Sequence, residues 1–88
     1  MRKRNRNRNR IYRHVERILE RTTDVSHVDR LESRVVAACD RVEKWSQITL
    51  DLGEPQAVED MAYAGYVRSL VRERTHEWRE WDNILAGA

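Results

Sequence analysis

The fold is decided by residues 28–52, which read VDRLESRVVAACDRVEKWSQITLDL. Apolar or small side chains recur here at intervals of three and four residues, at Val28, Leu31, Val35, Ala38, Val42, Trp45, Thr49 and Leu52. This heptad spacing predicts one long α-helix, of about residues 26–52, with a continuous apolar seam. Trp45 belongs to the seam, and we therefore expect its indole to lie in the core.

A tight reversal follows this helix. Gly53 is typical of the residue just beyond a helix end, and Pro55 is typical of the first turn of a new helix. We expect the next helix over about residues 55–85, because one stripe of that segment has helical spacing. The stripe consists of Ala57, Met61, Ala64, Val67, Val71, Trp78, Trp81 and Leu85. Because Trp78 and Trp81 belong to it, we expect them to pack against the other helices, and stacking on nucleic-acid bases is the alternative. The rhythm of the stripe fails at Arg74 and Thr75, and the two helices should form an antiparallel hairpin.

A shorter helix is predicted ahead of the hairpin, over about residues 10–22. Its apolar positions have helical spacing and are Ile11, Val15, Ile18 and Leu19. Ser26, with Asp29 three residues later, favours an N-cap for the following helix. The predicted fold class is therefore all-α: a long helical hairpin with a shorter N-terminal helix, in a single helical domain of residues 10–88.

The charge of the chain is unevenly distributed. The first thirteen residues hold seven basic side chains and no acid, which is a charge of +7. The other 75 residues hold ten basic and fifteen acidic side chains, which is −5. Residues 4–9 repeat Arg-Asn three times, and this composition predicts that residues 1–9 form a flexible basic arm that is disordered when free. If the arm is extended on a partner, its arginines fall on one side and could follow a phosphate chain. If it becomes helical instead, its arginines spread around the cylinder and suit a groove, and the sequence does not choose between the two.

Such an arm favours a polyanionic partner, because lysine and arginine displace condensed counterions from nucleic acid. The residues expected to contact phosphate are Arg2, Lys3, Arg4, Arg6, Arg8, Arg10 and Arg13. The pattern does not distinguish DNA from RNA. The alternative is a structural or assembly protein, such as a virion component or a coiled-coil adaptor, whose arm docks on an acidic protein surface.

Self-association is also expected, since two long helices and one short one leave much apolar surface uncovered in so small a body. The side chains left off the predicted stripes, which we expect at an interface between subunits, are Val36, Ile48, Tyr63, Tyr66 and Leu70. A homo-oligomer would multiply the basic arms and raise the avidity for a polyanion.

Nothing in the sequence indicates catalysis. Cys39 has no base at a useful spacing and is expected to be a buried structural residue. His76 and Glu80 are one helical turn apart but lack a second pair of ligands, and the charged residues 72–82 look like a solvated helix face. We therefore expect no enzymatic activity, no metal and no cofactor. No segment is apolar and long enough for a membrane, so a soluble intracellular protein, in host cytoplasm or a virion, is expected.

Residues 26–85 resemble the helical hairpin of phage small terminase subunits. The resemblance rests on Val28-Asp29-Arg30-Leu31, on Ala38-Cys39-Asp40-Arg41-Val42, and on Trp45 and Gly53. It implies a small, self-assembling protein with basic ends that hands viral DNA to a packaging motor. Only the basic segment as a class, and no single functional residue, is carried over from that family.

Overall fold

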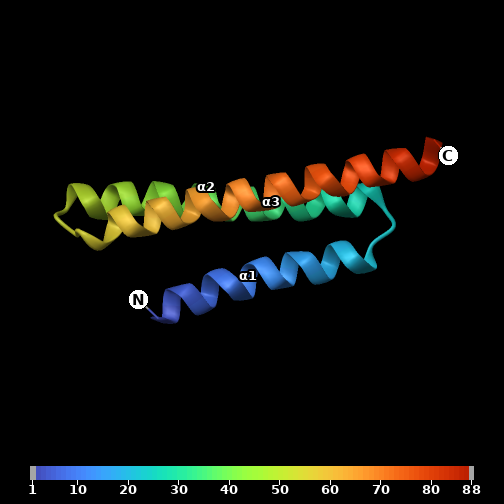
Figure 1. Cartoon of the computed structure of the whole chain (residues 1–88). Helices are drawn as coiled ribbons and strands as arrows, with labels where there is room; N and C mark the ends of the chain where they lie inside the picture. Colours follow the sequence, from blue (N-terminus) through green and yellow to red (C-terminus); the bar gives the residue numbers. More distant parts are fainter. Residues whose placement is uncertain (1, 88) are drawn as a thin grey trace.

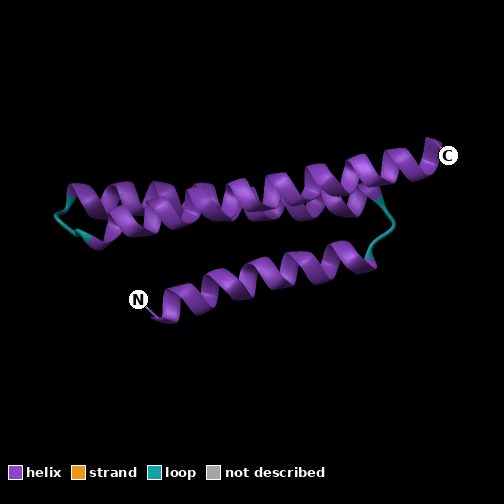
Figure 2. Ribbon diagram, in the orientation of Figure 1, coloured by secondary structure: helices purple, strands orange, loops and turns teal. Residues whose placement is uncertain are grey.

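The chain forms three helices joined by two short loops (Figures 1 and 2). The computed structural model describes residues 2–87, with the side chains of residue 11 and residues 13–87. The helices are α1 (Arg2–Arg21), α2 (Val25–Asp51) and α3 (Gln56–Gly87). α2 and α3 form an antiparallel hairpin, and α1 runs beside it in the direction opposite to α2 (Figure 1). The all-α class, the long hairpin and the shorter N-terminal helix are confirmed.

The molecule is an elongated rod. Its principal extents are 55 × 23 × 14 Å and its radius of gyration is 15.3 Å, against roughly 12 Å for a compact domain of this length. A rod of this kind has a thin core and a large surface.

Local capping sets where the hairpin helices begin and end. Asp24 is the N-cap of α2, and its carboxylate accepts a hydrogen bond from the backbone N–H of Ser26 at 2.9 Å. The prediction that Ser26 itself caps the helix is wrong, because the carboxylate two residues earlier already occupies that role. The helix bounds otherwise lie within one or two residues of the predicted 26–52 and 55–85.

The turn between α2 and α3 is a Schellman motif. The N–H of Gly53 donates to the Leu50 carbonyl at 2.9 Å, and the N–H of Glu54 donates to the Thr49 carbonyl at 3.0 Å. Gly53 has a φ of 95°, a left-handed conformation that side chains disfavour. The predicted reversal at Gly53 and Pro55 is thus confirmed.

α1 is longer than predicted. It begins at Arg2 instead of near residue 10, and the helical backbone of residues 2–9 differs from the disorder that their composition predicts. Arginine is among the better helix formers, and extending an existing helix needs no new nucleus. The helix nucleated by the apolar turns between Ile11 and Leu19 can therefore continue through the Arg-Asn repeat. Met1 lies outside the described residues.

The core lies at the open end and middle of the hairpin. Its buried hydrophobic side chains form one cluster of Val15, Leu19, Val28, Cys39, Ala64, Val67 and Val71. Thr75, where the sequence pattern predicts a gap, is fully buried and continues the α3 stripe. Its hydroxyl contacts the Glu32 carboxylate and the Val71 carbonyl, the latter at 2.9 Å. The predicted interruption is therefore filled by a hydrogen-bonded polar side chain.

The second half of the predicted seam does not face the core. Val28 is fully buried, but Trp45 is 67% exposed and Leu52 is 79% exposed. The prediction of a buried Trp45 is wrong for two reasons. A straight α-helix drifts by about 20° for each heptad, so the buried residues in this part of α2 are Cys39 and Ser46. Moreover, the apolar stripe of α1 ends at Ile11, so that α1 offers no apolar partner to the seam beyond that point.

Substitution of Gly65 and of Gly53 by alanine should change the free energy of unfolding in opposite directions. Gly65 lies inside α3, and an added Cβ would meet only Glu43 Oε1 at 3.8 Å, which is an ordinary contact. Gly65→Ala should therefore raise the free energy of unfolding by roughly 0.8–1 kcal/mol. Gly53→Ala should lower it by about 1–2 kcal/mol, because alanine is strained at a φ of 95°. Urea unfolding followed by circular dichroism measures both, and a loss of stability in Gly65→Ala would contradict the packing described.

Candidate functional site

The carboxyl-terminal half of α1 is anchored in the core. Val15 is 1% exposed and Leu19 is 4% exposed, and both belong to the same buried cluster as Val28 and Val71. Burying two such side chains stabilises the attachment by about 1.5–3 kcal/mol each, as an upper estimate. This attachment turns the side of α1 that carries Val15 and Leu19 toward the hairpin.

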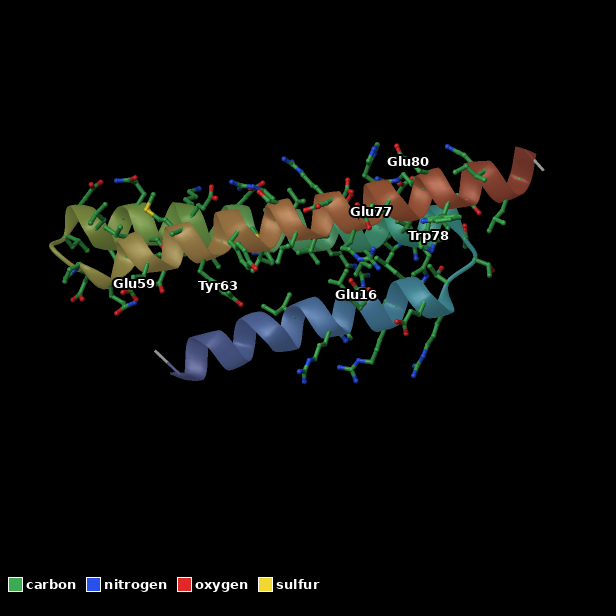
Figure 3. The ribbon with its side chains drawn as sticks, in the orientation of Figure 1. Glu16, Glu59, Tyr63, Glu77, Trp78 and Glu80 are labelled. Atoms are coloured by element: carbon green, nitrogen blue, oxygen red, sulfur yellow. The ribbon has the colours of Figure 1, made fainter. Side chains whose placement is uncertain are left out.

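Polar contacts reinforce the anchor from α3. The indole Nε1 of Trp78 donates a hydrogen bond to the Leu19 carbonyl oxygen at 3.1 Å. Arg74 donates through Nη2 to Glu16 Oε2 at 2.6 Å and also pairs with Glu77 on its own helix. Figure 3 shows Glu16 and Glu77 between α1 and α3. The hydrogen bond to Glu16, with a smaller contribution from Glu77, outweighs partial burial and raises the pKa of Arg74.

The segment of residues 72–82 is therefore more than a solvated helix face. Arg74 joins α3 to α1, and Arg79 joins α3 to α2 by pairing with Asp29 at 2.7 Å and with Glu32 at 3.2 Å. Sequence patterning indicates only mixed charge here, because it does not show which charges meet across helices. Trp78 is partly buried against the core as predicted, whereas Trp81 is 65% exposed and the prediction that it packs is wrong.

The opposite side of α1 carries exposed cations. Arg13, Arg17 and Arg21 are all exposed, and none of them forms an ion pair within the part of the chain that the structure describes. Arg17 donates only to the backbone carbonyl of Arg13, at 3.3 Å. In Figure 3, nitrogen-tipped side chains extend from α1 away from the hairpin. Glu20 is the exposed acid on this part of α1, since Glu16 is engaged by Arg74.

Six of the seven predicted phosphate-contacting side chains lie outside the described ones: Arg2, Lys3, Arg4, Arg6, Arg8 and Arg10. Arg13 is the member whose side chain is described, and it is exposed. The backbone of residues 2–10 belongs to the same continuous helix as Arg13. In the view of Figure 1 the gap between the ribbons of α1 and the hairpin widens toward the N-terminus. The structure thus brings the predicted residues onto one helix, together with Arg17 and Arg21, which the sequence reasoning missed.

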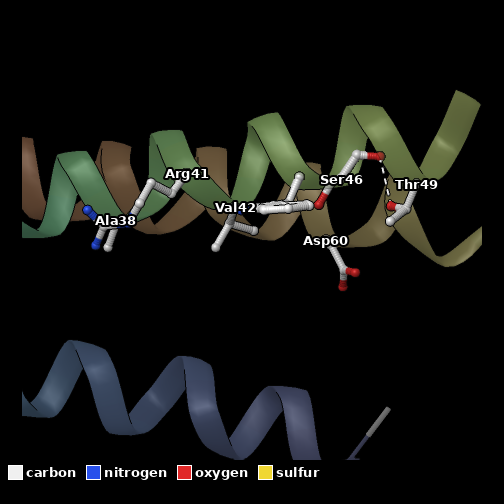
Figure 4. Close-up of a pocket in the computed structure, with 7 residues that line it drawn as sticks. Ala38, Arg41, Val42, Ser46, Thr49 and Asp60 are labelled. Carbon is white, nitrogen blue, oxygen red and sulfur yellow. Dashed lines mark hydrogen bonds between the residues drawn. The ribbon is translucent and has the colours of Figure 1, made fainter.

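A second surface is apolar. It is formed by the outward half of the α2 seam, which comprises Val42, Trp45, Thr49 and Leu52, and we call it the α2 stripe. Three of these residues line a cavity of about 500 Å³ together with Ala38, Ser46 and Asp60 (Figure 4). An adjoining cavity of about 410 Å³ between α1 and the hairpin is lined by Ile11, Ile18, Leu31 and Val35, among others. The two cavities share Ala38 and Val42, so the apolar surface is continuous.

The residues predicted for an interface between subunits lie in different environments. Ile48 is 43% exposed and Tyr66 is 48% exposed, so both are accessible. Val36 and Leu70 are half-buried. Tyr63 is also half-buried, packs against the core and points from α3 toward α1 (Figure 3).

The other side chains considered for chemistry, Cys39, His76 and Glu80, lie in settings that do not indicate a reactive or metal-binding site. Cys39 is buried in the core, and burial raises the pKa of its thiol above the ordinary value, which disfavours the reactive thiolate. His76 Nε2 lies 3.0 Å from Glu80 Oε1 on an exposed helix face. Across residues 2–87, no cluster of three or more His, Cys, Asp or Glu side chains is arranged to hold a metal ion. Over the same residues, none of the helices has the length and apolarity needed to cross a bilayer.

Comparison with protein-family models, with curated proteins and with solved structures finds no match to this chain. The assignment of function therefore rests on the geometry of its own residues.

Proposed function

We propose that the chain is a non-enzymatic nucleic-acid-binding protein that contacts phosphates through the basic N-terminal part of α1. The observation that supports this proposal most directly is the division of α1 into two sides. One side is anchored to the hairpin by Val15 and Leu19, and the other exposes Arg13, Arg17 and Arg21 to solvent. Exposed arginines without acidic partners are available to neutralise phosphates.

The charge distribution supports the same proposal. The acidic side chains nearest the anchor are already paired within the protein, as in the contact of Glu16 with Arg74. The hairpin carries most of the acidic residues, so that a polyanion would be attracted to α1 and repelled by the body. This asymmetry would orient the protein on its partner, with α1 toward the nucleic acid.

For the biological role, we infer viral DNA packaging of the small-terminase type. The support is the resemblance of residues 26–85 to the helical hairpin of that family, together with the basic segment and the apolar surface available for self-assembly. In this role several copies would present their α1 helices to one DNA molecule, and avidity would strengthen a modest individual affinity.

A salt titration tests the nucleic-acid proposal. The test variant replaces four basic residues by glutamine together: Arg4, Arg6, Arg8 and Arg10. The slope of log affinity against log salt should fall by about 1.8 units if two of them contact phosphate and by about 3.6 units if all four do. The matched control replaces four exposed cations of the hairpin: Arg30, Arg41, Lys44 and Arg72. Its slope should remain that of the unaltered protein. Equal slopes for the two variants, or no binding by the unaltered protein, would contradict the proposal.

The second candidate function is that of an assembly protein, and the α2 stripe favours it. Val42, Trp45 and Leu52 repeat at heptad spacing and are exposed in the single chain. A heptad stripe is completed by another helix, and an identical stripe on a second copy would supply one. We infer a homo-oligomer formed through this surface. In an assembly protein of this kind, α1 would dock on an acidic protein surface instead of on nucleic acid.

Substitution of Trp45 tests the inferred oligomer. Trp45→Glu should weaken self-association at least about 30-fold, because a large exposed aromatic residue at the centre of an interface is a typical hot spot. Trp81→Glu is the matched control, since Trp81 is 65% exposed but lies outside the α2 stripe. Sedimentation equilibrium measures the change. The inference would be contradicted if the unaltered protein were monomeric at about 100 micromolar. It would also be contradicted if both substitutions weakened self-association equally.

A further inference from the structure

The helical conformation of α1 arranges its arginines in a way that their number alone does not reveal. An α-helix turns by about 100° per residue, so residues three and four apart share a side. Six arginines of α1 follow this spacing, at positions 2, 6, 10, 13, 17 and 21. The intervals between them are four, four, three, four and four residues. These six positions fall within an arc of about 100°. We call this set the arginine ridge.

The described part of the structure fixes which way the ridge faces. Arg13, Arg17 and Arg21 are its exposed carboxyl-terminal members, and they lie opposite the buried Val15 and Leu19. The ridge is therefore on the side of α1 away from the hairpin. Positions 4 and 8, in contrast, share a side of the helix with Ile11 and Val15, which is the side toward the hairpin.

We propose that the arginine ridge binds duplex DNA, with α1 lying in the major groove and its arginines reaching the flanking phosphates. This inference rests on the proposed nucleic-acid-binding function and specifies its substrate. A helix with side chains is about 10–12 Å across, and the major groove of B-form DNA is about 12 Å wide. The corresponding groove of duplex RNA is too narrow and deep for side chains to read.

The dimensions and the charge of the ridge match this partner. Nineteen residue steps at 1.5 Å give a ridge about 28 Å long, which spans roughly eight base pairs. Six arginines along that length face a duplex that carries one negative charge per about 1.7 Å. A rigid row of cations loses less entropy on binding than a flexible tail, and it favours a partner of fixed shape over a single strand. Arg17 and Arg21 thereby belong to the site, although they lie beyond the predicted basic arm.

Three matched double variants test the ridge, and each removes two positive charges from α1. Arg6→Gln/Arg10→Gln and Arg17→Gln/Arg21→Gln alter the ridge, and Arg4→Gln/Arg8→Gln alters the other side of the same helix. On a mixed-sequence 24-base-pair DNA duplex, each ridge variant should lose about 1.8 units of log–log salt slope, or about 60-fold in affinity at 0.1 M salt. The Arg4/Arg8 variant should lose clearly less slope than either ridge variant, because positions 4 and 8 lie on the side of α1 toward the hairpin. Circular dichroism checks that all three retain their helix content.

The outcomes separate this inference from the proposed function. All three variants could lose affinity equally, or only the two variants within residues 4–10 could lose it. Either result would mean that the segment acts as a flexible polycation. The proposed ridge would then be wrong, while the proposed nucleic-acid binding would still hold. Tighter binding to the single strand of the same sequence, or to an RNA duplex of that sequence, would also overturn the assignment to duplex DNA. Absence of binding by the unaltered protein to all three probes would overturn the proposed function itself.

Discussion

The attachment of α1 to the open end of the hairpin is the constraint on which the rest of the structure depends. It consists of two buried side chains, Val15 and Leu19, a hydrogen bond from the Trp78 indole, and the ion pair of Arg74 with Glu16. These contacts hold one side of α1 against the core, and the described arginines on the opposite side, Arg13, Arg17 and Arg21, are exposed to solvent. A helix attached only by apolar burial would be freer to rotate, and the hydrogen bond and ion pair remove that freedom by requiring one register.

The same attachment explains the division of the apolar surface. α1 packs mainly against α3, and its apolar stripe between Ile11 and Leu19 joins the core of the hairpin. Beyond this stripe α1 continues as arginine and asparagine, and the seam residues Val42 and Trp45 are 42% and 67% exposed. A single short stripe on α1 therefore determines two surfaces at once: a cationic side directed outward and an apolar stripe on the hairpin. The first suits a polyanion, and the second suits another helix.

The hairpin could be predicted from the sequence because its determinants are local. The periodicity of residues 28–52 and the turn chemistry of Gly53 and Pro55 do not depend on distant neighbours. The exposure of Trp45 could not be predicted, since a heptad pattern identifies a stripe but not the helix that covers it. The burial of Thr75 was hidden for a similar reason: a polar residue is buried only where a partner such as Glu32 meets it. The arginine side of α1 required knowing that the helix continues through the Arg-Asn repeat, whereas composition indicates disorder.

Hydrogen exchange measured by NMR tests the attachment of α1 most directly. If α1 is anchored as described, the amides of Val15 and Leu19 and the indole N–H of Trp78 open only when the whole domain unfolds. They should then exchange as slowly as the most protected amides of α2 and α3. Exchange of the α1 amides at the rates of an unstructured peptide, while the hairpin stays protected, would contradict the account.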